Sequence, residues 1–353
     1  MKLVTSAGAL LELGPRYRFT TRLQAGPGTA LRGTSVVGPV YLTGGGDPLL
    51  ATGAYARRYL GARATPMGAL VRPLRRLGIR RIAGPIVADE RVFDARRLGP
   101  GWPSDYLSYS SPLSGLSTNQ GWAGNARRAH VSSLPIAAAE RLRAALRGVR
   151  IAHSGGLRAG ATPRAAVPLA EVRSRTVAAI LRSMNPDSDN FVAEMLTKAV
   201  GAHAAGRGTT AAGTARTAAA LRARGILDGG DRLVDGSGLS RANRLSATSL
   251  VRLIAAADRE RAWGAPLIQS MPRGGEGTLA RRLRRGPATK RVRAKTGYLG
   301  GVSALAGRVV SVRGQRYAFA LLMGTGDIAG ARATQDRVVS LLAAGAEDLP
   351  GGA

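Results

Sequence analysis

The sequence predicts a mixed α/β (α+β) protein in which one domain, built of helices and an antiparallel sheet, is interrupted by an inserted mixed α/β domain. The chain has 353 residues, more than a typical single domain. Its apolar pattern is helical at the start, strand-like between residues 23 and 171, and helical again from about residue 172. We therefore expect one domain from residues 1–22 and 172–353, with residues 23–171 inserted into it.

The first predicted element is a helix that begins with the chain. Leu3, Ala7 and Leu10 recur at helical spacing, and Gly14-Pro15 provides a stop signal. No capping residue precedes this helix in the sequence. We therefore expect that a preceding segment is missing.

The predicted insert mixes short strands with turns and one helix. Strand-like apolar runs cover residues 35–43 and 82–88, and Gly44–Pro48 is a turn. A stretch rich in Gly, Ser and Pro follows at residues 99–124, and a helix is predicted near residues 136–147. This alternation indicates an inserted mixed α/β domain.

Helices dominate the chain after the insert. Asp187–Asp189 is expected to cap a helix, an alanine-rich helix covers residues 209–224, and Ser246 is the predicted N-cap of a helix over residues 247–257. The helix before this cap has one apolar face, formed by Val177, Ile180, Leu181 and Met184.

The end of the chain reads as a sheet closed by a helix. Strands are predicted over residues 291–296, 302–312 and 316–323, with a tight hairpin at Val312–Gln315. A final helix is predicted over residues 329–345. Consecutive strands joined by a short turn pair antiparallel, so this region predicts an antiparallel sheet flanked by helices.

Charge is the most unusual property of the composition. The chain has 52 Lys and Arg against 21 Asp and Glu, a formal net charge of +31, which favours an anionic partner. Three explanations stay open: nucleic acid, an anionic cell-wall polymer, and a coding bias toward Arg, Ala and Gly. Aromatic residues make up only 4% of the chain, so platforms for stacking bases are scarce. We expect no specific nucleic-acid partner.

Several kinds of site are excluded by residue type. The sequence has no cysteine, which excludes disulfides and thiolate chemistry. His130, His153 and His203 are not spaced as metal ligands. No apolar run approaches the ~18 residues of a membrane-spanning helix. We expect no metal site and no organic cofactor.

Three short motifs carry the chemistry. Lys295-Thr296-Gly297 begins a predicted strand, Ser188-Asp189-Asn190 enters a predicted helix, and Lys2 begins the first helix. Each motif is weak alone, because a basic chain contains many such tripeptides and serine commonly caps helices. In this order they match the S-x-x-K, S-x-N and K-T-G set of penicillin-interacting serine enzymes. The serine of S-x-x-K would stand three positions before Lys2, outside the chain.

Six ordered segments resemble the class C low-molecular-mass penicillin-binding proteins, the D-alanyl-D-alanine carboxypeptidase/endopeptidase family. They are Met1–Thr5, Tyr41–Pro48, Met184–Leu196, Asp235–Arg241, Gly277–Leu279 and Lys295–Val309. The resemblance spans nearly the whole chain and implies a transpeptidase/β-lactamase-like domain, interrupted by an insert between its first two motifs. β-Lactamases share the motifs but lack the second and fourth segments and the large insert, so we rank them lower.

The resemblance implies how the nucleophile is activated. A serine hydroxyl becomes a good nucleophile when a nearby base takes its proton. Lys2 is the candidate base, because burial and the positive charge of Lys295 depress a lysine pKa. Ser188 is implied as the proton relay to the leaving D-alanine nitrogen. Asn190 is implied to hold the peptide amide and to orient the Lys2 side chain.

Substrate binding is implied for the K-T-G strand. Lys295 and Thr296 would bind the terminal carboxylate of the substrate, and Gly297 would let the substrate lie against the strand edge. The oxyanion would be held by two backbone N–H groups, from the absent serine and from Tyr298. The family usually has threonine where Tyr298 stands, so a narrower pocket and a weaker carboxylate contact are expected.

The implied function is cleavage of peptidoglycan stem peptides that end in D-Ala-D-Ala, through an acyl-enzyme that β-lactams trap. Carboxypeptidase and endopeptidase action both stay open. We expect Met1 to be a misassigned start, with the serine and an export signal upstream, and the full-length protein to act outside the cytoplasmic membrane. The chain as written is expected to be inactive. The alternative is a truncated homologue that binds cell-wall peptides without hydrolysis.

Overall fold

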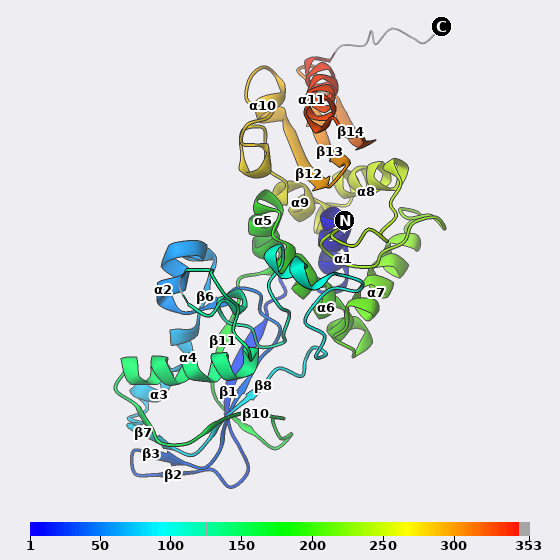
Figure 1. Ribbon diagram of the computed structural model, residues 1–353. Coiled ribbons are helices and arrows are strands. Elements are labelled where there is room, and N and C mark those ends of the chain that lie inside the picture. The colour runs from blue at the N-terminus through cyan, green and yellow to red at the C-terminus, as the bar shows by residue number, and fades with distance from the viewer. Residues whose placement is uncertain (125, 346–353) are drawn as a thin grey trace, which may run out of the picture. The chain divides into compact units, whose positions relative to one another are not determined.

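The computed structural model describes residues 1–124 and 126–345 (Figure 1). Contacts divide the chain into two compact units. The first unit contains Met1–Arg16, Val177–Ala193 and the chain from Thr214 onward, and the second contains Tyr17–Thr176 and Glu194–Gly213. Each unit is described below by itself.

The expected domain limits lie close to the limits of these units. The first boundary falls after Arg16, where residue 22 was expected, and the second falls after Thr176, where residue 171 was expected. Residues 194–213 group with the second unit, although the sequence placed them in the first. The assignment of a catalytic domain and an inserted domain stays a prediction, and its residues 346–353 lie outside the described part of the chain.

The helical part of the first unit is centred on α1 (Lys2–Glu12). Two helices pack against it, α5 (Val177–Asp187) and α9 (Arg261–Ser270), which also contact each other. The apolar face predicted for α5 is confirmed, because Val177, Ile180, Leu181 and Met184 are buried. Burying such a face against neighbouring helices supplies most of a helix's stability. α1 is therefore fixed inside the unit along nearly its whole length.

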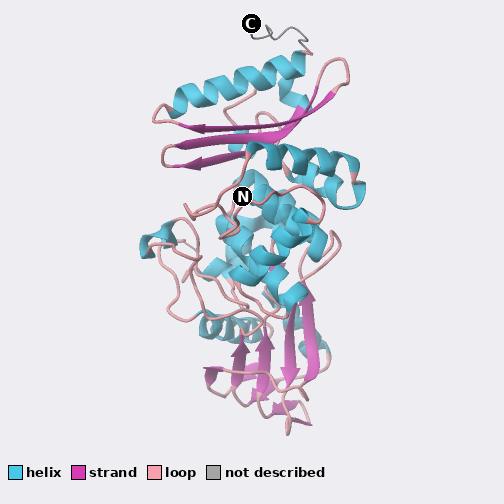
Figure 2. Ribbon diagram, turned by 90° about the vertical axis from the view of Figure 1, so that its right-hand side faces the viewer, coloured by secondary structure: helices cyan, strands magenta, loops and turns pink. Residues whose placement is uncertain are grey.

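The second part of the first unit is a three-stranded antiparallel sheet. Its strands lie in the order β12 (Val292–Leu299), β13 (Val302–Val310) and β14 (Arg316–Gly324). α11 (Ile328–Ala344) and α8 (Ala247–Arg259) contact the sheet, and Figure 2 shows the strands between helices of this unit. The predicted antiparallel sheet flanked by helices is confirmed.

Three further helices have residues in this unit. They are α6 (Asn190–Ala205), α7 (Thr210–Arg222) and the short α10 (Ala288–Arg291).

The predicted cap of α8 is confirmed, because the Ser246 hydroxyl accepts a 3.0 Å hydrogen bond from the Ser249 N–H. A local capping signal was sufficient to place the start of that helix.

The second unit contains two larger sheets. One has the order β10 (Leu157–Ala159), β8 (Ile86–Asp89), β4 (Val40–Thr43), β1 (Thr20–Ala25) and β11 (Val167–Arg173). The other has the order β2 (Ala30–Arg32), β3 (Ser35–Val37), β7 (Arg81–Ala83) and β9 (Ala152–His153). The remaining elements are β5 (Leu50–Ala51), β6 (Thr65–Pro66), α2 (Gly53–Tyr55), α3 (Arg72–Arg76) and α4 (Leu134–Gly148). The predicted helix near residues 136–147 is confirmed by α4.

Two predicted strands of the second unit are wrong as single elements. The run over residues 35–43 breaks into β3 and β4, and the run over residues 82–88 breaks into β7 and β8, so that each half joins a different sheet. Both breaks fall at Gly-Pro, namely Gly38-Pro39 and Gly84-Pro85. Proline has no N–H to donate to a ladder, so a strand seldom continues through it inside a sheet. The two breaks lie side by side, because the Gly38 N–H donates to the Ala83 carbonyl at 3.1 Å.

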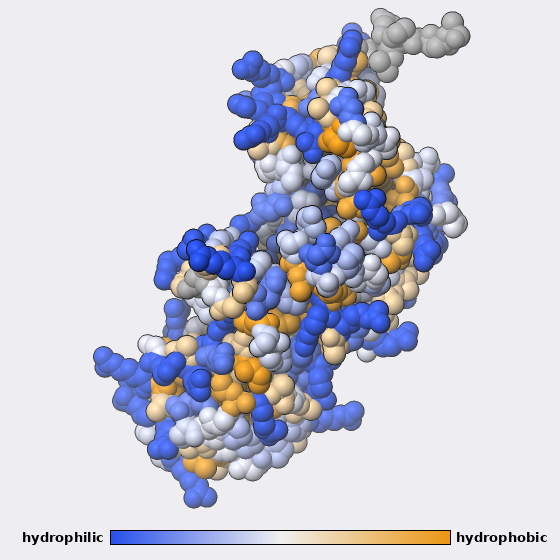
Figure 3. All heavy atoms as spheres, in the orientation of Figure 1, coloured by the Kyte–Doolittle hydropathy of each residue, from blue (hydrophilic) through white to orange (hydrophobic). Residues whose placement is uncertain are grey.

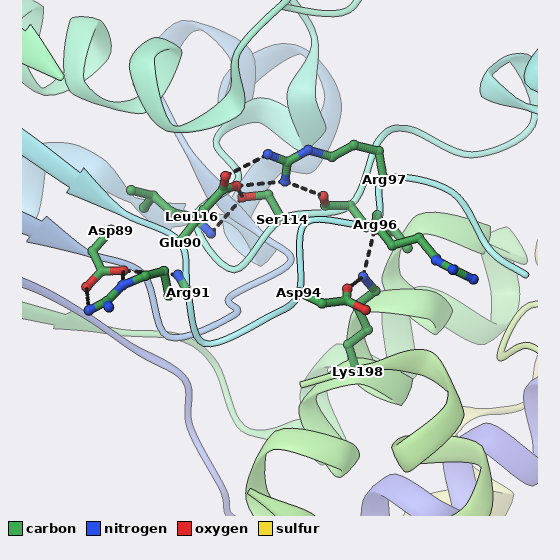
Figure 4. A network of polar contacts seen from close by, with 10 residues as sticks. Asp89, Glu90, Arg91, Asp94, Arg96, Arg97, Ser114, Leu116 and Lys198 are labelled. Carbon is green, nitrogen blue, oxygen red and sulfur yellow. Dashed lines mark hydrogen bonds and ion pairs between the residues drawn. The ribbon is translucent and has the colours of Figure 1, made fainter. Parts of the chain in front are cut away.

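The loop after β8 is held by charged side chains of the same unit. Arg97 pairs with Glu90, which also accepts a hydrogen bond from the Ser114 hydroxyl, and Lys198 of α6 pairs with Asp94 (Figure 4). The Lys198 side chain is completely buried, and its ammonium also donates to the Arg96 carbonyl at 2.7 Å. A buried ammonium needs such partners, because its transfer from water is costly. This network therefore anchors the loop to α6.

Candidate active site

The centre of the candidate site is the ammonium of Lys2, the first residue of α1. Its side chain is buried, and Nζ donates to the Asn190 Oδ1 at 2.5 Å and to the Ser237 carbonyl at 2.8 Å. Asn190 is the first residue of α6. The structure thus joins two residues that the sequence placed in separate motifs. All of these residues belong to the first unit.

A loop that begins at Asp235 supplies the second Lys2 contact. The Asp235 carboxylate accepts from the backbone N–H groups of Gly238 at 2.8 Å and Ser240 at 2.5 Å, and from the Asn243 side chain at 2.8 Å. One buried carboxylate therefore organises the turn of the loop. This folding aims the Ser237 carbonyl at Lys2. Sequence reasoning singled out this loop but gave it no role, because a backbone carbonyl leaves no residue-type signal.

Two further contacts of the first unit fix the N-terminal turn of α1. The Thr5 hydroxyl donates to the Gly236 carbonyl at 2.6 Å. Asn185, which is fully buried, donates to the hydroxyls of Ser6 at 3.0 Å and Ser270 at 2.7 Å. These buried polar contacts hold α1 in one axial position, and so they determine where the Lys2 amine lies.

Lys295 brings a second amine to the site. It lies on β12 and is 6% exposed, and its Nζ donates to the Thr296 carbonyl at 2.9 Å. Burial, and secondly the positive charge of Lys2, lower the pKa of Lys295 to about 7. Lys2 and Lys295 therefore share one electrostatic environment. A lysine with this pKa exchanges its proton readily near neutral pH.

Ser188 lies in the turn between α5 and α6 with a left-handed backbone, at φ 54°. Its N–H donates to the Asn185 carbonyl at 3.3 Å, and its hydroxyl has no hydrogen-bond partner among the described residues. The expected capping of α6 is made by Asp189, whose Oδ1 accepts from the Val192 N–H at 3.0 Å. The structure does not join Ser188 to Lys2 by a hydrogen bond, and its role as relay stays a prediction.

The other predicted residues lie along β12. This strand pairs with β13 on one side only. On its other edge the Ala294 N–H donates to the Pro272 carbonyl at 3.1 Å, so among the described strands that edge is unpaired beyond Ala294. Thr296 is partly buried, Gly297 is exposed, and Tyr298 is 64% exposed with the Arg332 guanidinium 5.6 Å from its ring centre. An open edge presents backbone N–H and C=O groups that an extended peptide can pair with.

Other kinds of site receive no support from the described residues. No group of three or more His, Cys, Asp or Glu among residues 1–124 and 126–345 is arranged to hold a metal ion. No described helix has both the length and the apolar character that crossing a bilayer requires.

This fold and this site define a penicillin-binding type of enzyme domain, and comparison with known proteins names the family. The model of the D-Ala-D-Ala carboxypeptidase 3 (S13) family matches residues 1–126 and 124–344. The chain belongs to this family. It is 30% identical to the D-alanyl-D-alanine carboxypeptidase of Actinomadura sp. (strain R39), over 97% of this chain and 76% of the relative. It is 32% identical to the carboxypeptidase DacB of Mycolicibacterium smegmatis, over 91% of this chain and 69% of the relative.

Solved structures confirm the fold class. Penicillin-binding protein 4 (dacB) from Haemophilus influenzae matches with a TM-score of 0.80 and 23% identity, over 96% of this chain and 90% of that one. The same protein complexed with a β-lactam matches with a TM-score of 0.71. The predicted mixed α/β fold of the transpeptidase/β-lactamase type is therefore correct.

Proposed function

We propose that the complete enzyme is a serine-type D-Ala-D-Ala carboxypeptidase that cleaves peptidoglycan stem peptides through an acyl-enzyme. The observation that carries the proposal is the hydrogen bond between Lys2 Nζ and Asn190 Oδ1, in a site that also holds the buried Lys295. Family membership supports the reaction class, and this contact between two motifs supports the choice of residues. We also propose that the complete enzyme acts outside the cytoplasmic membrane, where such peptides occur.

The proposed nucleophile is a serine that stands three positions before Lys2, on a segment preceding Met1. Residues three apart on a helix share one face, so one added turn at the start of α1 places the serine hydroxyl beside the Lys2 amine. This is the S-x-x-K arrangement of penicillin-interacting enzymes. Because the serine is not in residues 1–353, we propose that this chain alone forms no acyl-enzyme.

The proposed reaction has two steps. The neutral amine of Lys2 takes the serine proton as the hydroxyl oxygen attacks the carbonyl carbon of the penultimate D-alanine. The bond to the terminal D-alanine then breaks, and the Ser188 hydroxyl passes a proton to the leaving nitrogen. Water hydrolyses the acyl-enzyme in the second step. Asn190 keeps the Lys2 amine in place throughout.

The substrate is proposed to lie along the open edge of β12. Lys295 and Thr296 attract its terminal carboxylate, and the backbone N–H of Tyr298 contributes to the oxyanion hole. β-Lactams act as inhibitors because they acylate the same serine and the resulting acyl-enzyme is hydrolysed slowly. A carboxypeptidase releases free D-alanine from a pentapeptide, whereas an endopeptidase cleaves cross-linked dimers, so the two substrates distinguish these activities.

Labelling with a fluorescent penicillin tests the proposal. The chain extended upstream to include the serine should form a covalent adduct that survives denaturing electrophoresis. The same chain with that serine changed to alanine should not, and neither should residues 1–353. An extended chain that stays unlabelled and releases no D-alanine would favour the alternative of a non-catalytic homologue that binds cell-wall peptides.

A further inference from the structure

A cationic groove lies on the first unit around α10, beside the start of β12. The groove is open and has a volume of about 630 Å³. Its lining includes four cationic side chains, Arg284, Arg285, Lys290 and Arg291, and no acidic one. Figure 3 shows hydrophilic side chains projecting from the region of α10. We call this surface the α10 groove.

The cations of the α10 groove lack counterions. Arg284, Arg285 and Lys290 are exposed, and none of them forms an ion pair or side-chain hydrogen bond with a described residue. Arg291 donates to the Ser311 carbonyl at 3.0 Å, which leaves its charge uncompensated. The nearest basic neighbour in sequence with an acidic partner is Arg282, which pairs with Asp336. That pairing occupies the carboxylate of α11 and leaves the groove wholly positive.

The sequence around the groove is rich in basic residues. Residues 277–326 contain 11 Lys and Arg and no Asp or Glu, whereas the whole chain has 21 Asp and Glu in 353 residues. Four cations that line one groove and have no acidic partner among the described residues favour an anionic ligand.

The shape and lining of the groove narrow the class of ligand. Four cations in one open groove suit a polyanion better than a single small ion. Guanidinium groups bind phosphate through two parallel hydrogen bonds, and three of the four cations are arginines. The lining has no aromatic residue on which a nucleic-acid base could stack. We propose that the α10 groove binds a linear phosphodiester polymer that carries no bases.

Binding of a synthetic, fluorescently labelled poly(glycerol phosphate) chain to residues 1–353 tests this proposal. The variant R284Q/R285Q/K290Q should bind about tenfold or more weakly, and its affinity should fall less steeply with salt, because fewer counterions are released. A matched control is R32Q/R72Q/R76Q, which removes from the second unit three exposed arginines that have no partner among the described residues. If the location of the charges matters more than the net charge, the affinity of the control for the polymer should stay within about twofold of the parent's.

Several outcomes would overturn the proposal. Equal losses in the two triple variants would show that only net charge matters. A single-stranded oligonucleotide of matched charge that binds as tightly would assign the surface to nucleic acid, and equal binding of poly-L-glutamate would remove the preference for phosphate. Circular dichroism checks that the triple variant is folded, and R285Q alone provides a milder variant in which a smaller loss is still required. The test needs no catalysis, so its result is independent of the proposed function.

Discussion

The Lys2 ammonium and the Asn190 side-chain oxygen are joined by a 2.5 Å hydrogen bond across 188 positions of sequence. The bond links the first residue of α1 to the first residue of α6. Two helix starts therefore meet at one amine, and the position of that amine depends on how both helices are held.

Replacing Asn190 with alanine tests this relationship directly. Asn190→Ala removes an acceptor from a buried ammonium, so the free energy of unfolding should fall by about 1–3 kcal/mol. Urea unfolding of residues 1–353 measures this change. Ser188→Ala is the control, because its hydroxyl has no partner among the described residues, and it should change stability by less than about 0.5 kcal/mol. Equal effects would mean that the Lys2 contact adds nothing.

The lowered pKa of Lys295 predicts a pH dependence of stability. Its folded pKa is about 7 and its ordinary value is 10.5, so between these values the unfolded chain binds a proton that the folded chain does not. Stability therefore rises with pH through this window, by about 1.4 kcal/mol per pH unit from this group. Below pH 7 the full cost of the buried charge is present.

Lys295→Met should remove that contribution. The variant should be more stable than the parent below pH 7, and the difference should shrink steadily and vanish near pH 10.5. Urea midpoints of both proteins across this range give the measurement. The control is Lys290→Met, at an exposed lysine, whose free energy of unfolding should change with pH in the same way as that of the parent. A constant difference between Lys295→Met and the parent would contradict the assignment.

Gly238 is expected to be needed for the contact between its loop and α1. Its φ of 92° disfavours any side chain, and a Cβ there would lie 3.1 Å from the Met1 Cβ. Gly314 has a similar φ of 86° but open space around it. Gly238→Ala should therefore cost about 1 kcal/mol more than Gly314→Ala in chemical unfolding. If both variants lose the same free energy of unfolding, backbone strain alone explains the loss and the contact with Met1 adds nothing.

The buried Lys198 predicts a rescue experiment in the second unit. Asp94→Ala removes the carboxylate that pairs with the buried Lys198 ammonium and leaves only the smaller electrostatic influence of the buried Glu194. It should cost about 3 kcal/mol, and the double variant D94A/K198M should recover part of that loss. Thermal and urea unfolding measure both. The exposed pair of Arg173 and Glu171 offers a comparison, since Glu171→Ala should cost less than about 1 kcal/mol. A double variant as unstable as the single one would contradict this account.

The sequence predicted the elements whose signals are local. Ser246 marked the start of α8 because a capping hydroxyl acts on the next turn. The breaks at Gly38-Pro39 and Gly84-Pro85 were missed for a tertiary reason. Val36, Val40 and Leu42 all enter the same core, so the apolar alternation continues across a break that separates two sheets. The hydrophobic pattern therefore predicted correctly that these residues are buried, but it wrongly predicted that each run forms one continuous strand.

The catalytic and binding roles of the candidate site residues stay predictions, but one contact between them is now visible. Lys2, Asn190 and Lys295 were named from motif order, and the structure places all three in the first unit, with Lys2 bound to Asn190. The contact from Ser237 was not predictable, because it is made by a carbonyl that every residue has. Its position depends on the hydrogen bonds of Asp235, and only the fold reveals these.

The discontinuity of the first unit also has a consequence for biosynthesis. The second unit ends at Gly213, so all of its residues have been translated before most of the first unit leaves the ribosome. α1 is made before the second unit, yet its partner α9 and the strand that carries Lys295 come much later. Contacts between residues so far apart in sequence form slowly. The part of α1 that packs against α9 therefore has no partner until residues 261–270 have been made, and in that interval its apolar side chains can promote aggregation.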